Sequence, residues 1–449
     1  MSMERLTVSD NQRYIVNEDG QPFFWLGDTA WELFHRMDRE DAELYFKTRA
    51  AQGFTVIKAV VLAEQDGLRV PNRFGEVPFI DLDPSKPNEK YFAFVDECLD
   101  MAERNGLYIG LLPTWGDKVT PLWGLGPVVF NEKNSFGYGN FLGKRYKDRT
   151  NILWVLGGDR PAWHENTDYR PIWRAMAKGI EEGIGQKVFM TYHPWGSSAS
   201  TYAWLNGEDW LSMHMMQSGH GGGHDMPVWD WVERDLNLIP PRPTLDGEPN
   251  YEDHPVNPWP KFDPRNGYFN DYDVRKQVYR SVFAGACGVT YGHHSMWQCL
   301  SAGMTPANHP EGQPFFTWKE ALERPGASQM VYLKNLMMSR PYLQRIPDQS
   351  FILSDKGKAG GHVRATRSLA GHYAFVYLPL PLAVTVKTSI LSGTKTKVWF
   401  YDTVTGESIL RGIFDKQEEM TVTPPGGRPD WVVVFDNESK NYGPPGTGK

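Results

Sequence analysis

Two acidic residues of the chain follow short apolar runs, at positions suited to acid–base chemistry. Asp159 follows the run at residues 152–156 and two glycines, and Glu248 follows the run at residues 243–245. Two carboxyl groups suffice to hydrolyse a glycosidic bond, because one protonates the leaving oxygen and the other attacks the anomeric carbon or activates a water. The two groups lie about 5–5.5 Å apart in retaining enzymes and about 6.5–9.5 Å apart in inverting ones. We predict that Asp159 and Glu248 form such a pair, although either acid alone would suit a salt bridge or a helix N-cap.

Further polar and aromatic residues follow the other apolar runs and could bind a sugar. Flat indole rings match the apolar faces of sugar rings, while carboxylates and imidazoles can hydrogen-bond to hydroxyl groups. The alternatives are that each tryptophan packs in a large core and that Asp28 caps the helix that follows it. The candidate substrate-binding residues are Asp28, Trp31, Trp115, His193, Trp195, His214, His293 and Trp297.

The histidines also allow an alternative chemistry, because imidazole is a common metal ligand. His220 and His224 flank three glycines, and His214 lies nearby in the sequence. A metal-dependent hydrolase barrel usually carries a His-x-His pair in its first strand, and the first apolar run lacks one. The sequence also lacks a serine nucleophile elbow, a Walker-type phosphate loop and an HExxH motif. We therefore favour the carboxylate pair, which requires no metal or organic cofactor.

The elements that must position these residues alternate between apolar runs and amphipathic segments. Apolar runs separated by helices are typical of parallel strands that are covered on both faces. Eight such units predict a (β/α)8 barrel over residues 1–341, with an active site at the carboxyl ends of the strands. A doubly wound sheet is the alternative, but no GxGxxG turn follows any run. The predicted strands lie near residues 23–26, 54–62, 107–112, 152–156, 188–192, 211–216, 243–245 and 289–291, and the predicted helices at 39–51, 90–104, 168–182, 227–238 and 273–286.

The pattern changes after Arg340-Pro341. Alternating runs at residues 373–377, 398–401 and 431–435 are separated by turn signals such as Thr405-Gly406, and helical periodicity is absent. This pattern predicts a small antiparallel β-sandwich over residues 342–440. Residues 441–449 are rich in glycine and proline and are expected to form a flexible tail.

Composition excludes several functional classes. The 449 residues are 40% hydrophobic and 22% charged, with a net charge of −7, which does not favour binding to nucleic acid or to an anionic membrane surface. No apolar stretch is long enough to span a bilayer. The three cysteines, Cys98, Cys287 and Cys299, are expected to be buried thiols. Residues 1–16 show no secretory signal, so we expect a cytoplasmic protein unless a leader has been removed, in which case it is periplasmic or secreted.

Three strings of residues resemble the apiosidase-like family, which is family 140 of the glycoside hydrolases. They are FWLGDTAW at residues 24–31, which is followed by GFTVI at 53–57, then WVLGGD at 154–159 and DGEPNYE at 246–252. The order of domains also matches, because the region from about residue 342 resembles the C-terminal β-sandwich of that family, which is described as a collagen-binding domain. The resemblance covers nearly the whole chain.

The resemblance implies a retaining glycosidase on a (β/α)8 barrel. It assigns Asp159 as the acid/base at the end of strand four and Glu248 as the nucleophile at the end of strand seven. Most of the larger clan carries an Asn-Glu pair at strand four, whereas this chain has Gly158-Asp159, in agreement with the apiosidase-like branch. The activity that the family implies is hydrolysis of apiosyl linkages in the pectin rhamnogalacturonan II.

The sequence thus predicts a retaining glycoside hydrolase whose partner is a polysaccharide or oligosaccharide substrate. Two alternatives stay open. One is a glycan- or collagen-binding protein on a barrel that does not catalyse, and the other is the metal-dependent hydrolase. The sequence does not indicate an oligomeric state.

Overall fold

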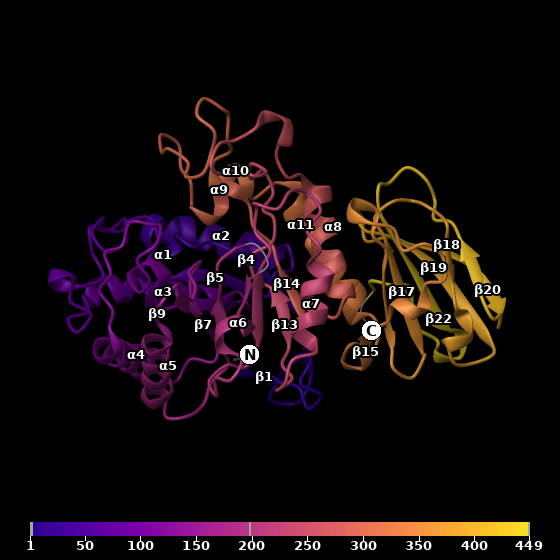
Figure 1. Cartoon of the computed structure of the whole chain (residues 1–449), viewed down its shortest axis with the longest axis horizontal. Coiled ribbons are helices and arrows are strands. Elements are labelled where there is room, and N and C mark those ends of the chain that lie inside the picture. The colour runs from indigo at the N-terminus through magenta and orange to yellow at the C-terminus, as the bar shows by residue number, and fades with distance from the viewer. Residues whose placement is uncertain (1–2, 197–198, 448–449) are drawn as a thin grey trace.

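Eight parallel strands form a nearly closed barrel in the computed structural model, which describes residues 3–196 and 199–447 (Figure 1). Hydrogen-bonded pairing runs in the order β10-β7-β6-β5-β4-β14-β13-β12. The remaining seam is bridged where the Ser212 amide donates to the Met190 carbonyl at 2.8 Å. The predicted (β/α)8 barrel is therefore confirmed. Its strands are β4 (Trp25–Thr29), β5 (Val56–Val60), β6 (Tyr108–Leu112), β7 (Ile152–Gly157), β10 (Met190–His193), β12 (His214–Gln217), β13 (Thr244–Asp246) and β14 (Gly288–Thr290).

The barrel strands are short and buried almost throughout, because the barrel interior covers one face and helices cover the other. The predicted helix at residues 39–51 begins where expected, since the Asp38 carboxylate accepts a hydrogen bond from the Asp41 amide at 3.0 Å. The main covering helices are α2 (Arg39–Ala51), α3 (Glu89–Arg104), α4 (Glu132–Tyr146), α5 (Arg170–Ile184), α7 (Val228–Leu236), α8 (Asp271–Phe283) and α11 (Pro325–Met338).

Helix α4 was not predicted, because its sequence contains three glycines, which are poor helix formers. The structure shows why two of them are there. A Cβ atom at Gly139 or Gly143 would collide with the Met176 or Ile180 carbonyl of α5, so glycine allows the two helices to approach closely. Gly179 of α5 meets the α4 backbone in the same way. Helix propensity is therefore overridden by packing between the two helices.

A small N-terminal sheet, which was also not predicted, covers the amino ends of barrel strands. The Tyr108 hydroxyl at the start of β6 donates to the Glu4 carbonyl at 2.5 Å, and Thr150 before β7 donates to the Met3 carbonyl at 2.5 Å. This sheet contains β1 (Leu6–Val8), β2 (Ile15–Asn17) and β3 (Pro22–Phe23). The remaining short elements of this part are α1 (Leu33–Arg36), α6 (Tyr202–Leu205), α9 (His294–Trp297), α10 (Trp318–Ala321), β8 (Trp163–His164), β9 (Thr167–Asp168) and β11 (Ala199–Ser200).

The C-terminal part is an antiparallel β-sandwich, as predicted. A six-stranded sheet in the order β15-β16-β17-β22-β19-β20 packs against a two-stranded sheet, and Val376 and Val433 of the first share a core with Val386 and Met420 of the second. The strands are β15 (Arg345–Pro347), β16 (Arg364–Ser368), β17 (Tyr373–Leu378), β19 (Lys395–Asp402), β20 (Ser408–Asp415) and β22 (Trp431–Asn437), with β18 (Val384–Val386) and β21 (Met420–Val422) in the small sheet.

The chain end that was expected to be a flexible tail contacts the rest of the molecule. The Gly443 carbonyl accepts a hydrogen bond from Arg340 at 3.0 Å, and the Pro445 carbonyl accepts one from Ser408 at 2.7 Å. Residues 448 and 449 of that segment lie outside the described residues.

The sandwich lies against α8 and α11 of the barrel (Figure 1). Two buried ion pairs hold this contact. Arg275 of α8 contacts Asp430 at 2.7 Å, and Arg340, which follows α11, contacts Asp436 of β22 at 2.8 Å. Because all four side chains are almost completely buried, each charge depends on its partner.

All three cysteines are buried free thiols, as predicted. Among the described residues, every helix is too short or too polar to cross a bilayer.

Removing one charge of a buried pair should weaken the contact between barrel and sandwich. Asp436→Ala leaves the Arg340 guanidinium buried without its carboxylate, so we expect the free energy of unfolding to fall by about 3–5 kcal/mol. Urea unfolding followed by tryptophan fluorescence measures it. Asp263→Ala, which removes the carboxylate of an exposed ion pair with Arg265, is the control and should change little. Equal stability of the two variants would contradict this role for Asp436.

Candidate active site

The carboxyl ends of the barrel strands surround a cavity of about 680 Å³. Both predicted acids line it, Asp159 after β7 and Glu248 after β13, the fourth and seventh strands of the barrel. A cleft at this end of a (β/α)8 barrel is where such enzymes place their chemistry. Its walls also contain six tryptophans, namely Trp31, Trp115, Trp123, Trp195, Trp259 and Trp297.

Two imidazoles hold the carboxylate of Glu248. His193 Nε2 lies 3.1 Å from Oε2, and His220 Nε2 lies 3.3 Å from Oε1. The other ring nitrogens fix the tautomers: His193 Nδ1 accepts from the Asp159 amide at 3.3 Å, and His220 Nδ1 accepts from the Tyr251 amide at 3.4 Å. His220 Nε2 therefore carries a proton that it donates to Oε1, whereas His193 Nε2 lies close to Oε2 without the alignment of a hydrogen bond.

This arrangement keeps Glu248 ionised. Burial alone would raise the pKa of Glu248, but the contacts with His193 and His220 outweigh it and hold the pKa well below its usual range. An ionised carboxylate at the wall of such a cavity is suited to act as a nucleophile or as a general base.

Asp159 has the opposite environment. Burial raises the pKa of Asp159; the Arg160 guanidinium opposes this rise and the negative charge of Glu248 adds to it. Oδ2 accepts hydrogen bonds from Trp123 Nε1 at 2.9 Å and from Arg160 Nη1 at 3.0 Å. Among the residues that the structure describes, none hydrogen-bonds to Oδ1, which leaves this oxygen to carry a proton.

The turn that carries Asp159 explains the two glycines before it. Gly157 and Gly158 have φ angles of +84° and +119°, and Asp159 itself has φ +52°. A Cβ atom at Gly158 would lie 2.8 Å from the Trp115 ring. Such left-handed conformations cost free energy outside glycine, and in Asp159 the strained residue is one of the two acids of the cavity.

Lys58 lies within the barrel beside Glu248. It is fully buried, its ammonium donates to the Gly247 carbonyl, and it lies 4.3 Å from the centroid of the Trp31 ring. Burial lowers the pKa of Lys58 to about 7, against the opposing effect of the charges of Glu248 and Asp246. Lys58 was not predicted because it lies inside β5 rather than at its end.

Glu64 is a further cavity residue that sequence reasoning missed. It lies four residues beyond the end of β5, where no motif marks it. Burial is the main cause that raises the pKa of Glu64 to about 8, so it is mostly protonated at neutral pH and can donate a hydrogen bond. Trp123 was missed for a similar reason, since it lies in the long segment between β6 and α4.

Five of the eight predicted substrate-binding residues meet at this site. Trp31, Trp115, Trp195 and Trp297 line the cavity, and His193 contacts Glu248. Trp195 also stacks on Trp123, with ring centroids 5.8 Å apart and an interplanar angle of 13°.

The other three predicted residues, Asp28, His214 and His293, do not line this cavity. Asp28 Oδ2 is buried and accepts from the Tyr45 hydroxyl at 2.7 Å and from Arg49 at 2.6 Å, so it forms a structural ion pair. His214 begins β12 instead of ending it, so it lies at the opposite end of the barrel from the cavity. His293 caps α9 and contacts Asp253 at 3.0 Å.

The histidines that suggested a metal site point to different partners. His220 faces Glu248, whereas His224 Nε2 contacts the Asn266 carbonyl at 3.0 Å. Within residues 3–196 and 199–447, no group of three or more His, Cys, Asp or Glu side chains is arranged to hold a metal ion.

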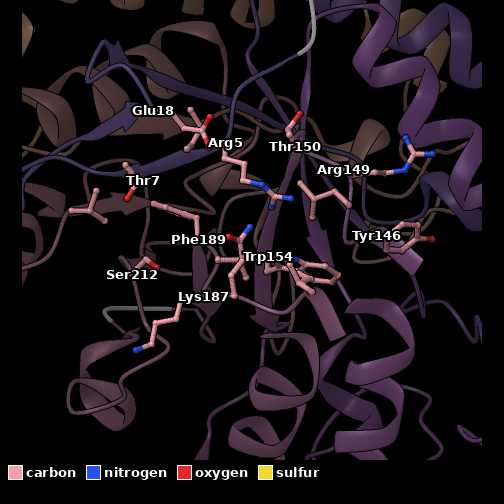
Figure 2. A pocket seen from close by; sticks show the side chains of 16 residues that line it. Arg5, Thr7, Glu18, Tyr146, Arg149, Thr150, Trp154, Lys187, Phe189 and Ser212 are labelled. Carbon is pink, nitrogen blue, oxygen red and sulfur yellow. The ribbon is translucent and has the colours of Figure 1, made fainter. Parts of the chain in front are cut away.

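A different cavity, of about 310 Å³, lies at the amino ends of the strands (Figure 2). Arg5, Arg149 and Lys187 line it together with Glu18. All three cations already have partners: Arg5 donates to the Lys147 carbonyl at 2.7 Å, Arg149 pairs with Asp100 at 2.7 Å, and Lys187 donates to the Asp209 carbonyl at 3.4 Å. This end of a (β/α)8 barrel serves stability, so we do not place chemistry there.

Comparison with known proteins agrees with this architecture. The family model "Apiosidase-like, catalytic domain" matches residues 9–344, and "Putative collagen-binding domain of a collagenase" matches residues 346–436. No curated protein matches the sequence.

Two solved structures are similar over nearly the whole chain. One, described as "Glycoside hydrolase", is 34% identical, with 98% of each chain covered and a TM-score of 0.87. The other, a glycoside hydrolase family 5 structure from Bacteroides vulgatus, is 32% identical, with 98% of this chain and 94% of that chain covered and a TM-score of 0.88. The chain therefore belongs to the apiosidase-like family of glycoside hydrolases.

Proposed function

We propose that the protein is a retaining glycosidase that cleaves apiosyl linkages, such as those of rhamnogalacturonan II, with Asp159 as acid/base and Glu248 as nucleophile. One observation carries the proposal: two carboxyl groups line the same cavity, and their surroundings displace their pKa values in opposite directions. When the pKa values of two neighbouring acids are displaced in opposite directions, one acid acts as the proton donor and the other stays ionised.

In the first step, a Glu248 oxygen attacks the anomeric carbon while the proton of Asp159 passes to the glycosidic oxygen, which leaves as a hydroxyl. The new glycosyl ester removes the negative charge of Glu248. The Asp159 carboxylate that remains is stabilised by the hydrogen bonds from Trp123 and Arg160.

In the second step, Asp159 removes a proton from a water, which attacks the anomeric carbon and releases Glu248 as a carboxylate. The His220 proton already donates to this carboxylate and the His193 ring lies 3.1 Å from it, so both imidazoles favour its departure from the sugar. The net result is hydrolysis with retention at the anomeric carbon and with no change in the protonation of the two acids.

The family and the chemistry of the cavity lining support this choice of sugar. The apiosidase-like model covers the whole barrel. The cavity walls combine indole rings with polar groups, namely Gln217 and the protonated Glu64, that can hydrogen-bond to sugar hydroxyls. The sandwich is proposed to support the barrel, since buried ion pairs join the two parts.

Removing either carboxyl group should abolish turnover. We expect Asp159→Asn to lose about 10²–10⁴-fold in kcat/KM because the leaving oxygen no longer receives a proton. Glu248→Ala should lose at least as much, and added azide should restore cleavage and yield a glycosyl azide. Sugar release from a panel of pectic glycans that includes rhamnogalacturonan II is the measurement.

Asp263→Asn, which changes an exposed carboxylate outside the cavity, is the matched control. Full activity of Asp159→Asn or Glu248→Ala would disprove the assignment of these residues. If the wild type releases a sugar other than apiose and both variants still lose activity, the mechanism is supported and only the substrate assignment changes.

The pH dependence of kcat/KM should respond to Trp123. Activity requires protonated Asp159, so it falls as pH rises through the pKa of Asp159. The Trp123 hydrogen bond lowers that pKa, and Trp123→Phe removes it. We therefore expect the alkaline limb of the profile to move to higher pH. Trp163→Phe, which changes an exposed indole outside the cavity, is the control and should not move the alkaline limb. A shift of the alkaline limb to lower pH in Trp123→Phe would show that Asp159 is not the group that titrates there.

A further inference from the structure

A smaller cavity lies beside the active-site cavity on the same face of the barrel. Its volume is about 250 Å³. The two cavities are lined by neighbouring residues of one loop, Asn308 on the active-site side and His309 on the other. The rings of His254, in the active-site wall, and His294, in the smaller cavity, lie 4.7 Å apart. A ligand in the smaller cavity would therefore lie next to a ligand at Glu248.

The smaller cavity contains buried polar groups without partners. His294 is 1% exposed, and neither of its ring nitrogens has a hydrogen-bond partner among the described residues. The same holds for the hydroxyl of Tyr268, which also lines the cavity. Unpaired buried polar groups are costly and uncommon, and a ligand that exchanges hydrogen bonds with them would remove the cost.

Two phenylalanines form the apolar side of the cavity. Phe315 and Phe316 are each 38% exposed, although they line a concave surface. The Arg324 guanidinium lies 4.7 Å from the centroid of the Phe316 ring, and the His309 ring lies 5.7 Å from that of Phe315. Apolar faces beside a few convergent hydrogen-bonding groups are typical of a ligand site, and this volume is just below the range of about 300–1,000 Å³ for drug-sized ligands.

The charges in the cavity favour a neutral ligand. Burial lowers the pKa of both His294 and His309, so both imidazoles are uncharged at neutral pH. Asp253 is the acidic residue of the lining, and its charge is balanced by contacts with His293 at 3.0 Å and Arg324 at 2.6 Å. The lining therefore offers no free positive charge that would attract a carboxylate or a phosphate.

We propose that this smaller cavity binds a neutral sugar residue of the same glycan whose linkage is cleaved between Asp159 and Glu248. The proposal rests on the proposed function, because it takes the ligand of the neighbouring cavity to be a glycan. The imidazole and phenol groups would hydrogen-bond to the sugar hydroxyls, and the phenylalanine rings would pack on an apolar face of the sugar ring. The cavity thus selects a substrate by a sugar outside the cleaved linkage.

Saturation-transfer NMR with free monosaccharides tests the site without relying on catalysis. The probes are apiose, arabinose, galactose and rhamnose, with galacturonate as the charged comparison. We expect at least one neutral sugar to bind more strongly than galacturonate. Tyr268→Phe, which removes only the unpartnered hydroxyl, should weaken that binding roughly threefold to tenfold. Phe316→Ala should weaken it further.

The controls separate the smaller cavity from the active site. Tyr442→Phe changes a half-buried tyrosine that packs on Arg340, far from both cavities, and should leave sugar binding unchanged. Trp195→Ala disturbs the active-site cavity and should leave the Tyr268-dependent signal in place. Thermal unfolding of each variant shows whether it is folded.

Two results would overturn the proposal. One is that no neutral sugar binds, and the other is that binding is unchanged in folded Tyr268→Phe and Phe316→Ala. Failure of the proposed function gives a different result: the wild type would cleave no apiosyl linkage, while a neutral sugar would still bind in a manner that depends on Tyr268.

Discussion

The chemistry of the site depends on the ionised carboxylate of Glu248 held between two imidazoles. Each imidazole can donate its Nε2 proton because a backbone amide occupies its Nδ1. One of those amides belongs to Asp159. The residue that carries the acid thus also orients the histidine that stabilises the opposing carboxylate. A shift of the turn after β7 would change both carboxyl groups together.

The barrel supplies this geometry from three separate strands. β7 delivers Asp159 through a turn that requires positive φ angles at Gly157 and Gly158, β10 ends at His193, and β13 is followed by Glu248. Since parallel pairing places His193 opposite Gly157, the histidine is in register with the turn that it supports. The buried Lys58 side chain, whose pKa is lowered to about 7, lies near the anion and carries a positive charge below that pH. The cavity is therefore organised before a substrate enters, which is what electrostatic stabilisation of a transition state needs.

Sequence alone predicts the barrel, the sandwich and the two carboxyl groups, because apolar runs that end in acids mark the active end of such a barrel. It fails where three-dimensional packing overrides local pattern. Helix α4 contains glycines that only the close approach to α5 explains. The sixth strand was predicted at residues 211–216, but it begins at His214, so this side chain lies at the amino end of the barrel instead of near the cavity. Asp28 is an acid at the end of a strand, as a substrate-binding residue would be, yet its carboxylate pairs with Arg49, which lies twenty-one residues later in the sequence. Glu64 and Trp123 lie in loops several residues beyond a strand end, so their sequence positions do not indicate that they line the cavity.

The most direct test of the account is to trap the intermediate on Glu248. A 2-fluoro apiosyl fluoride should react faster than the resulting ester hydrolyses, and digestion followed by mass spectrometry would locate the added sugar. We predict one modified peptide, with the sugar on Glu248, and none in Glu248→Gln. A sugar found on another residue, or cleavage of apiosyl linkages with inversion and no adduct, would contradict the central claim.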